Sequence, residues 1–381
     1  MTLQVQPVAR RITAVAWLPP HAGAAYNDAR LSFVTGSGGK HRELALWTTG
    51  NPDFAENATD EDQTTATEAA AAATLAARVA HDGDVRGIAA VSSRTIVTAS
   101  SFGTVSVYQT DEAAAERARL ELRESMTAHR FGDSAPAAAT DVAVQPGVAT
   151  ADAEVASCGE DGAIAYARVA RLDALQRYEV DSTVVTGVCW PTNAQTAACT
   201  RAGQVKVFDR RAPADVAAVL IASQTTTAAP SSSSLAFECI AAHPSQSFRL
   251  ATGTNAGSVL LWDTRNMRAP VIEAFNVHRA SVWDVCFDPV GSSSSFVSCS
   301  DDASLAVTQW SADPSSADED DSPSSISARP VRHISSFFNV LSVNCLDVCA
   351  FTRASVIVAG SDSGNLLIDK VPATDHHFRL F

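Results

Sequence analysis

The sequence predicts an all-β protein, a seven-bladed β-propeller whose ring is closed by the N-terminal strand. Three observations lead to this prediction. A unit of three short strands recurs seven times along the chain. Apolar residues alternate along these strands with the period of a pleated sheet, and turn residues separate the second strand from the third. One sheet cannot bury both of its faces, whereas sheets stacked radially around a channel can.

The clearest unit, residues 278–310, reads HRASVWDVCFDPVGSSSSFVSCSDDASLAVTQW. In its first strand Val282, Val285 and Phe287 are the apolar positions, and Pro289 ends the strand where no ladder donor is needed. A Ser-rich second strand, a turn and a third strand follow. The third strands of the seven units are expected to end at Trp47, Tyr108, Tyr166, Phe208, Trp262, Trp310 and Ile368.

These units form one expected domain, residues 2–372, with a tail at 373–381. The expected blades are residues 12–50, 79–110, 140–170, 181–211, 235–266, 278–313 and 335–372. Disordered or flexible insertions are expected at residues 53–77, 111–135, 223–234 and 313–330, of which the second begins with helical character. No good strand follows Lys370, and TLQVQPVA alternates Leu3 and Val5. We therefore expect residues 2–8 to supply the outer strand of the seventh blade.

Charge and cysteine content exclude several classes of protein. The formal net charge is −14 with no basic stripe, which argues against direct nucleic-acid binding. No apolar run reaches membrane-spanning length, and the N-terminus lacks the apolar core of a signal peptide, so we expect an intracellular protein without direct membrane insertion. The eight cysteines form no C-x-x-C pair. We interpret them as small buried hydrophobes in a reducing compartment and expect no metal and no cofactor.

No constellation of catalytic residues stands out. The nine histidines are dispersed, and the nucleophile, zinc-protease and P-loop motifs are absent. GSGGK, residues 36–40, superficially resembles a phosphate cradle, but its place between two strands favours a blade turn. His376–His377 lies near the C-terminus and is interpreted as tail. We therefore expect a protein that is not an enzyme.

The units resemble the WD-repeat family of β-propellers over nearly the whole chain. Trp262–Asp263 ends one blade, and His278 stands at the family spacing before Val282 and Val285. The resemblance implies structural blade residues, in which a His, a Ser or Thr, an Asp and a Trp form hydrogen bonds across a blade. These residues are Trp47, Trp262, Asp263 and the set His278, Ser298, Asp302 and Trp310.

A narrower resemblance is to the small seven-bladed WD-repeat nucleoporins of the Y-shaped outer-ring subcomplex of the nuclear pore. It rests on HDGDV (81–85), VFDRR (207–211), VAGSDSGNL (358–366) and above all LSVNCLDV (341–348). The Ala/Ser-rich insertions and a weak first repeat depart from that pattern. The resemblance implies a non-catalytic structural subunit that docks on other nucleoporins, with an α-solenoid subunit as the expected partner. It also implies localisation at the nuclear envelope and, in some organisms, at kinetochores in mitosis.

Four residues are candidates for a protein interface. In a propeller, an early residue of each innermost strand faces the rim of the channel, and these positions hold Arg86, Glu238, Trp283 and Asn344. Trp283 is either an anchor for a partner or packs on a neighbouring loop, and both interpretations remain open.

SVLLWDTRN, residues 258–266, supports an alternative function. Substrate receptors of cullin-type ubiquitin ligases in this family often end a blade with W-D-x-R, and Trp262, Asp263 and Arg265 match that pattern. Arg265 would then contact an adaptor. The other interpretation is that Trp262 packs between blades while Asp263 and Arg265 tie the strand to its turn.

Overall fold

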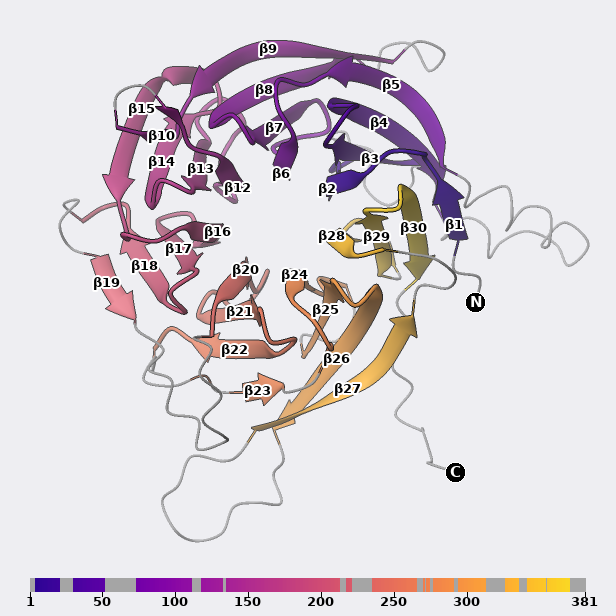
Figure 1. The fold of residues 1–381 in the computed structure, drawn as a ribbon, viewed down its shortest axis with the longest axis vertical. Coiled ribbons are helices and arrows are strands. Elements are labelled where there is room, and N and C mark those ends of the chain that lie inside the picture. The colour runs from indigo at the N-terminus through magenta and orange to yellow at the C-terminus, as the bar shows by residue number, and fades with distance from the viewer. Residues whose placement is uncertain are drawn as a thin grey trace, which may run out of the picture.

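Seven four-stranded antiparallel sheets surround a central channel in the computed structural model (Figure 1). The structure describes residues 4–20, 30–51, 73–111, 118–132, 135–212, 217–220, 235–265, 270, 272–274, 277–290, 294–312, 326–335, 341–353 and 355–370. Within these ranges every regular element is a β-strand, so no helix there could cross a membrane. The predicted fold class, a seven-bladed all-β propeller, is confirmed.

The first four blades follow one another along the chain, each running from the innermost strand outward. The first contains β2 (Ile12–Trp17), β3 (Arg30–Ser37), β4 (Glu43–Gly50) and β5 (Thr74–Ala80). The second contains β6 (Val85–Ala90), β7 (Thr95–Ser100), β8 (Thr104–Asp111) and β9 (Arg119–Thr127). The third contains β12 (Ala139–Val144), β13 (Glu154–Gly159), β14 (Ala163–Arg168) and β15 (Arg171–Glu179). The fourth contains β16 (Val185–Thr192), β17 (Gln195–Thr200), β18 (Val205–Asp209) and β19 (Ala217–Leu220).

The remaining three blades complete the ring. The fifth contains β20 (Phe237–Ala242), β21 (Arg249–Thr254), β22 (Val259–Asp263) and β23 (Ile272–Ala274). The sixth contains β24 (Val282–Phe287), β25 (Ser295–Ser300), β26 (Ser304–Ala312) and β27 (Ile326–Ser335). The seventh contains β28 (Val343–Cys349), β29 (Val356–Ser361), β30 (Asn365–Lys370) and β1 (Gln4–Pro7). A two-stranded hairpin, β10 (Arg130–Phe131) with β11 (Ala135–Pro136), lies between the second and third blades.

The N-terminal strand closes the ring, as the sequence predicts. β1 pairs antiparallel with β30, with Gln4 opposite Ile368 and Pro7 opposite Asn365. The Val8 N–H continues the pairing by donating to the Gly364 carbonyl at 2.7 Å. Figure 1 shows β1 beside β30 at the seam between the first and last blades. Because the two ends of the chain share one sheet, opening the ring requires breaking a β-ladder.

The outer strands lie partly in stretches expected to be insertions. β5, β9 and β27 overlap residues 53–77, 111–135 and 313–330. The helical character expected after residue 111 is wrong for residues 119–122, which belong to β9. An outer strand has a neighbour on one edge only, so its sequence carries little apolar alternation. RLELRESMT in β9 buries Leu120 and exposes Leu122 among charged residues. The fourth strand of each blade is therefore not apparent in the repeated three-strand pattern.

The hydrophobic core lies between successive blades. One cluster joins Trp17, Phe33 and Trp47 of the first blade to Val358 and Ile368 of the seventh. Blade contacts near the channel require small residues. A Cβ on Gly36, Gly253 or Gly360 would lie 2.3–2.6 Å from Val85, Val282 or Ile12 of the next blade.

Other blades fill the same position with cysteine. Cys158, Cys199 and Cys299 occupy the register position of these glycines in β13, β17 and β25. All three are fully buried. They therefore serve as small core residues, which is the role that the sequence suggests for the cysteines as a group.

Candidate functional site

The same backbone feature, a β-bulge, recurs in every blade at the mouth of the central channel. Each innermost strand shifts register by one residue near its start, which is the signature of a β-bulge. The bulges re-aim one side chain per blade, and these seven residues line a channel cavity of about 660 Å³. In blade order they are Thr13, Arg86, Thr140, Thr186, Glu238, Trp283 and Asn344. The four interface candidates from the sequence all belong to this set.

Four of the seven residues at the bulges tie their blade to the next. Thr13 Oγ1 donates to the Val85 carbonyl at 2.5 Å, and Thr140 and Thr186 make the equivalent bond at 2.6 and 2.7 Å. Asn344 Nδ2 donates to the Ile12 carbonyl at 3.1 Å and to Asp362 Oδ1 at 2.5 Å. Asn344 is therefore engaged in joining the seventh blade to the first, which lowers its availability to a partner.

Arg86, Glu238 and Trp283 make no such inter-blade bond with the residues that the structure describes. Glu238 forms an ion pair with Arg201 of the neighbouring blade, with 3.4 Å between Oε2 and Nη2. Arg86 is exposed and has no ion-pair partner among the described residues. Trp283 is 38% exposed, although Val282 and Val285 of the same strand are buried. These three residues are the side chains at the mouth that the ring leaves available or nearly so.

Three carboxylates deeper in the channel join blades in a different way. Asp141 Oδ2 accepts the Val188 N–H at 3.1 Å, and Asp284 Oδ2 accepts the Leu346 N–H at 3.0 Å. Asp347 Oδ2 accepts the Trp17 N–H at 2.8 Å. Innermost strands have an unpaired edge, and each carboxylate satisfies an N–H of that edge across a blade junction. LSVNCLDV thus contributes both Asn344 and Asp347 to the ring seam.

Burial shifts the titration of these carboxylates. Desolvation raises the pKa of Asp141 and of Asp347 to about 6, against hydrogen bonds from backbone N–H groups that lower it. The pKa of Asp284 rises to about 8, because desolvation is joined by the negative charges of Asp141 and Asp347. Sequence reasoning missed all three. The available signal was an acidic residue followed by Val inside a predicted apolar innermost strand, in TDV, WDV and LDV.

Within the sixth blade, part of the expected hydrogen-bond set forms. His278 Nε2 lies 2.8 Å from Ser298 Oγ, and Ser304 Oγ bridges His278 Nδ1 to Asp302 at 2.7 and 2.5 Å. Trp310 is outside this set. Thr308 holds the position at which a tryptophan would complete the set. It lies two residues after Ala306, the residue of β26 that pairs with Ser298. In the first and fifth blades that position holds Trp47 and Trp262, whose Nε1 atoms donate to Thr35 and Thr252 at 2.9 Å.

The third blade contains a histidine network that was not predicted from the sequence. His129 Nε2 lies 2.9 Å from Ser157 Oγ, and Nδ1 lies 2.9 Å from Asp161 Oδ1. Burial favours a higher pKa for Asp161, but hydrogen bonds from His129, the Arg130 N–H and Arg177 lower it to about 2. The β10–β11 hairpin separates His129 from its blade in sequence, and for this reason His129 lies outside the predicted third blade, residues 140–170.

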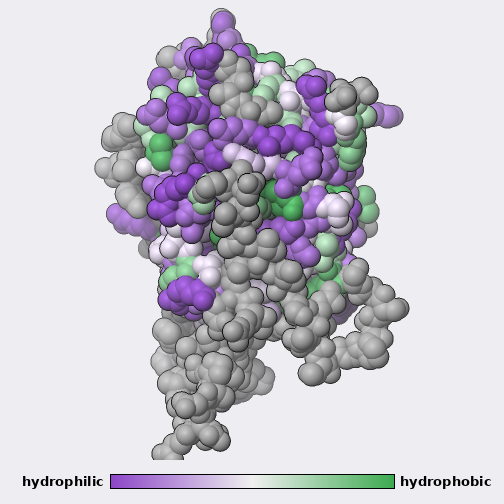
Figure 2. Space-filling view, turned by 90° about the vertical axis from the view of Figure 1, so that its left-hand side faces the viewer, coloured by the Kyte–Doolittle hydropathy of each residue, from purple (hydrophilic) through white to green (hydrophobic). Residues whose placement is uncertain are grey.

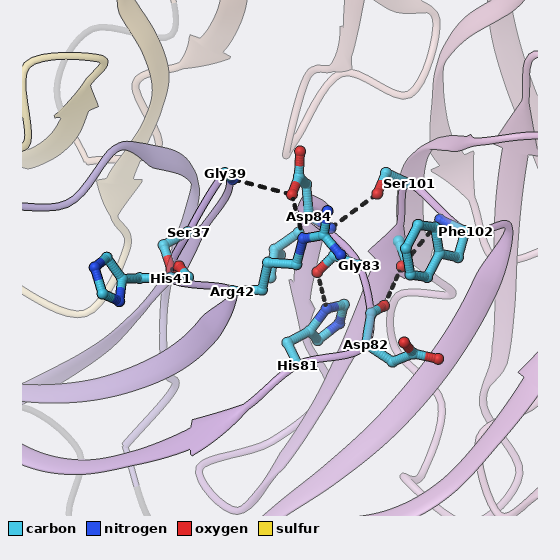
Figure 3. Close-up of polar contacts among 12 residues, drawn as sticks. Ser37, Gly39, His41, Arg42, His81, Asp82, Gly83, Asp84, Ser101 and Phe102 are labelled. Atoms are coloured by element: carbon cyan, nitrogen blue, oxygen red, sulfur yellow. Dashed lines mark hydrogen bonds and ion pairs between the residues drawn. The ribbon is translucent and has the colours of Figure 1, made fainter.

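Figure 3 shows polar contacts at the place where the first two blades meet. Asp84 Oδ1 accepts the Gly39 N–H and Arg42 Nε, each at 3.0 Å, while the Asp84 N–H donates to Ser101 Oγ at 2.8 Å. The Arg42 guanidinium lies 5.0 Å from the centre of the Phe102 ring. GSGGK is thus part of the connection between β3 and β4, where a carboxylate of the protein already binds the Gly39 N–H.

The W-D-x-R residues lie on the opposite face of the ring, at the end of β22. Arg265 Nε and Nη2 donate to the two Asp263 carboxylate oxygens at 2.9 and 2.6 Å. Its guanidinium stacks 3.7 Å from the centre of the Phe248 ring. Arg211 and Asp209 repeat this bidentate pair in the fourth blade. The fold therefore gives Arg265 intramolecular contacts, although 64% of its side chain is exposed.

In the described part of the chain, no group of three His, Cys, Asp or Glu side chains is placed to hold a metal ion. His376 and His377 lie outside the described residues.

Blades with His–Ser/Thr and Trp–Thr hydrogen bonds around a closed ring define a β-propeller of the WD-repeat type. The family described as "Nucleolar protein 10-like, N-terminal domain", a β-propeller family, matches residues 150–363, which is more than half of the 381 residues. The chain belongs to this family.

Two curated relatives are nucleoporins. The chain is 26% identical to nucleoporin Nup43 of Mus musculus over 302 residues and 26% identical to nucleoporin Nup43 of Homo sapiens over 300 residues. Each match covers 78% of this chain and 73% of the relative. The predicted resemblance to a small WD-repeat nucleoporin is confirmed, and the ligase-receptor alternative is not favoured by these relatives.

Proposed function

We propose that the protein is a structural subunit of the nuclear pore scaffold that docks on other nucleoporins and so supports pore assembly and nucleocytoplasmic transport. One observation carries the proposal: the similarity to Nup43 extends over most of both chains, and thus over most of the propeller. The role is that of a scaffold rather than an enzyme. A nuclear envelope location follows, and a kinetochore location in mitosis is part of the same proposal.

The geometry supports docking by a surface that is already ordered. The β1–β30 ladder, the side-chain bonds at the bulges and the bridging carboxylates fix neighbouring blades relative to one another. A partner that binds such a ring orders few groups on association, so little of the interaction free energy is lost. We propose an α-solenoid nucleoporin of the Y-shaped subcomplex as that partner.

The outer wall is a poorer docking surface on the side drawn in Figure 2. There the described residues are mainly hydrophilic, with small separate hydrophobic groups between them. Stable protein interfaces usually need a contiguous buried core of apolar or aromatic anchors. The channel mouth, which presents Trp283, offers such an anchor.

Affinity purification of the tagged protein from its own cells, followed by mass spectrometry, tests the proposal. We expect several nucleoporins to be recovered in near-equal amounts and a fluorescent fusion to label the nuclear rim. Recovery of nucleolar proteins with nucleolar labelling, or the absence of nucleoporins from the purified material, would reject it. Imaging of mitotic cells tests the kinetochore location separately.

A further inference from the structure

The channel carries a marked excess of negative charge. Seven carboxyl groups line it against three arginines: Asp141, Glu160, Glu238, Asp284, Asp301, Asp347 and Asp362 against Arg11, Arg86 and Arg201. Asp284, with a pKa of about 8, is mostly protonated at neutral pH, and the other six still outnumber the arginines. Two of the arginines are already neutralised, because Arg11 pairs with Asp362 at 2.5 Å and Arg201 pairs with Glu238 at 3.4 Å. Walls of one sign concentrate ions of the other sign in a cleft. The channel therefore favours a positively charged occupant.

Trp283 gives that occupant an aromatic surface. The bulge in β24 turns this residue into the channel, where it is 38% exposed. Among the described residues it makes no ring stacking, cation–π contact or side-chain hydrogen bond. The face of a tryptophan ring attracts cations, more strongly so when water is partly excluded. An indole inside an acidic channel thus has the environment in which a cation binds it best.

Two polar side chains that line the channel with Trp283 lack partners among the described residues. Asp301 is exposed at the mouth, and its carboxylate forms no ion pair or hydrogen bond with the described residues. Its backbone N–H donates to the Ser281 carbonyl at 3.0 Å, which holds Asp301 beside the start of β24. In the adjoining blade Ser342 also lines the channel; it is only 7% exposed, and its buried hydroxyl finds no hydrogen-bond partner among the described residues.

We propose that the channel mouth between the sixth and seventh blades binds an arginine side chain from an extended segment of a partner polypeptide. The guanidinium stacks on Trp283 and donates to the Asp301 carboxylate. Arginine fits better than lysine because its planar group stacks and donates in the same geometry. A cavity of about 660 Å³ also holds more than one side chain, so the backbone on either side of the arginine enters the mouth.

Arg86 restricts the charge that the bound segment can carry. It faces the same channel from the second blade, and it is the one arginine of the lining without a carboxylate partner among the described residues. A second basic residue close to the bound arginine would be repelled by the positive charge of Arg86. We therefore expect the partner segment to carry a single arginine at this point and to tolerate an acidic residue towards Arg86.

Calorimetric titration of the purified full-length chain tests the proposal with three peptides of one design, acetyl-Gly-Ser-X-Ser-Gly-amide. X is Arg, Gln or Glu. We expect the Arg peptide to bind at least about tenfold more tightly than the Gln peptide, since it adds both a cation–π contact and an ion pair. Its affinity is expected to fall as salt is raised. Equal binding of the Arg and Gln peptides would overturn the proposal.

Single substitutions then separate the contributions. Trp283→Ala and the isosteric Asp301→Asn are each expected to weaken the Arg peptide by about fivefold or more. Arg86→Gln is expected to strengthen it, because a like charge is removed. Phe102→Ala is the matched control: Phe102 is 40% exposed on the same face but does not line the channel. An unchanged affinity in both Trp283→Ala and Asp301→Asn, with thermal unfolding like that of the parent, would reject the site.

The identity of the partner as a nucleoporin rests on the proposed function, whereas the site itself does not. If the Arg peptide binds selectively but purification recovers no nucleoporins, the proposed function fails and the site stands. If nucleoporins are recovered but the Arg and Gln peptides bind alike, the site fails and the proposed function stands.

Discussion

The Asp347 carboxylate accepts the backbone N–H of Trp17 at 2.8 Å and thereby joins the last blade of the ring to the first. Trp17 donates a second bond to the same residue, from its Nε1 to the Asp347 carbonyl at 3.3 Å. Asn344 adds a third bond across the same seam through the Ile12 carbonyl. The seam is thus held by hydrogen bonds along the channel and by the β1–β30 ladder at the outer edge of the ring.

Asp347→Ala is expected to lower the free energy of unfolding by about 1–3 kcal/mol, because it leaves the Trp17 N–H buried without an acceptor. Asp347→Asn retains a side-chain oxygen and is expected to lose less. Urea titration of the two variants beside the parent measures the difference. Equal stability of the Ala variant and the parent would show that the seam does not depend on this carboxylate.

Stability is expected to fall as pH rises from about 4 to 8, because Asp284 has a pKa of about 8 in the folded chain and an ordinary acidic pKa when unfolded. Between these values the folded state binds more protons than the unfolded state, so raising the pH favours unfolding. Asp141 and Asp347, at about 6, contribute in the same direction over a narrower range.

Asp284→Asn cannot titrate and isolates the effect of Asp284. Denaturant midpoints measured every pH unit from 5 to 9 should decline less steeply in this variant than in the parent, with the residual decline assigned to Asp141 and Asp347. Parallel curves for the two proteins would mean that Asp284 titrates alike in both states.

Apolar alternation made the fold predictable, because each of the three inner strands of a blade packs on a neighbouring blade. It also located the early residues of the innermost strands, and the bulges later found there turn Arg86, Glu238 and Trp283 to the channel. Alternation does not show which of these side chains form hydrogen bonds between blades. Asn344 and Trp283 occupy equivalent positions, yet only Asn344 reaches a carbonyl of the next blade.

Two of the aromatic residues predicted to end third strands lie one or two residues away from the position that Trp47 holds in the first blade. Tyr166 lies one residue before the equivalent of Trp47, and its hydroxyl instead meets Thr196 of the next blade at 2.6 Å. Trp310 lies two residues after that position. Register at a strand end depends on pairing across the sheet, which a single sequence does not show.

Trp310 nevertheless belongs to the core, since it is 7% exposed and lies 5.9 Å from the ring centres of both Phe287 and Phe296. Trp310→Ala is expected to lower the free energy of unfolding by about 3–5 kcal/mol through lost contacts and the cavity left behind. Trp283→Ala, at the exposed channel position, is the matched control and should lose far less. A loss below about 1 kcal/mol in Trp310→Ala, measured by denaturant titration, would contradict its place in the core.

The thiols of the eight free cysteines are expected to be unreactive in the folded protein. Burial raises the pKa of the Cys199 thiol to about 12 and those of Cys158, Cys239, Cys299 and Cys345 well above their usual range, so little thiolate exists at pH 8. A colourimetric thiol reagent should label few or no groups in buffer and eight in denaturant. Cys286, which is partly exposed, would be the first to react if the seventh blade opens. Rapid labelling of several thiols under native conditions would contradict the buried, close-packed role assigned to these side chains within and between the blades.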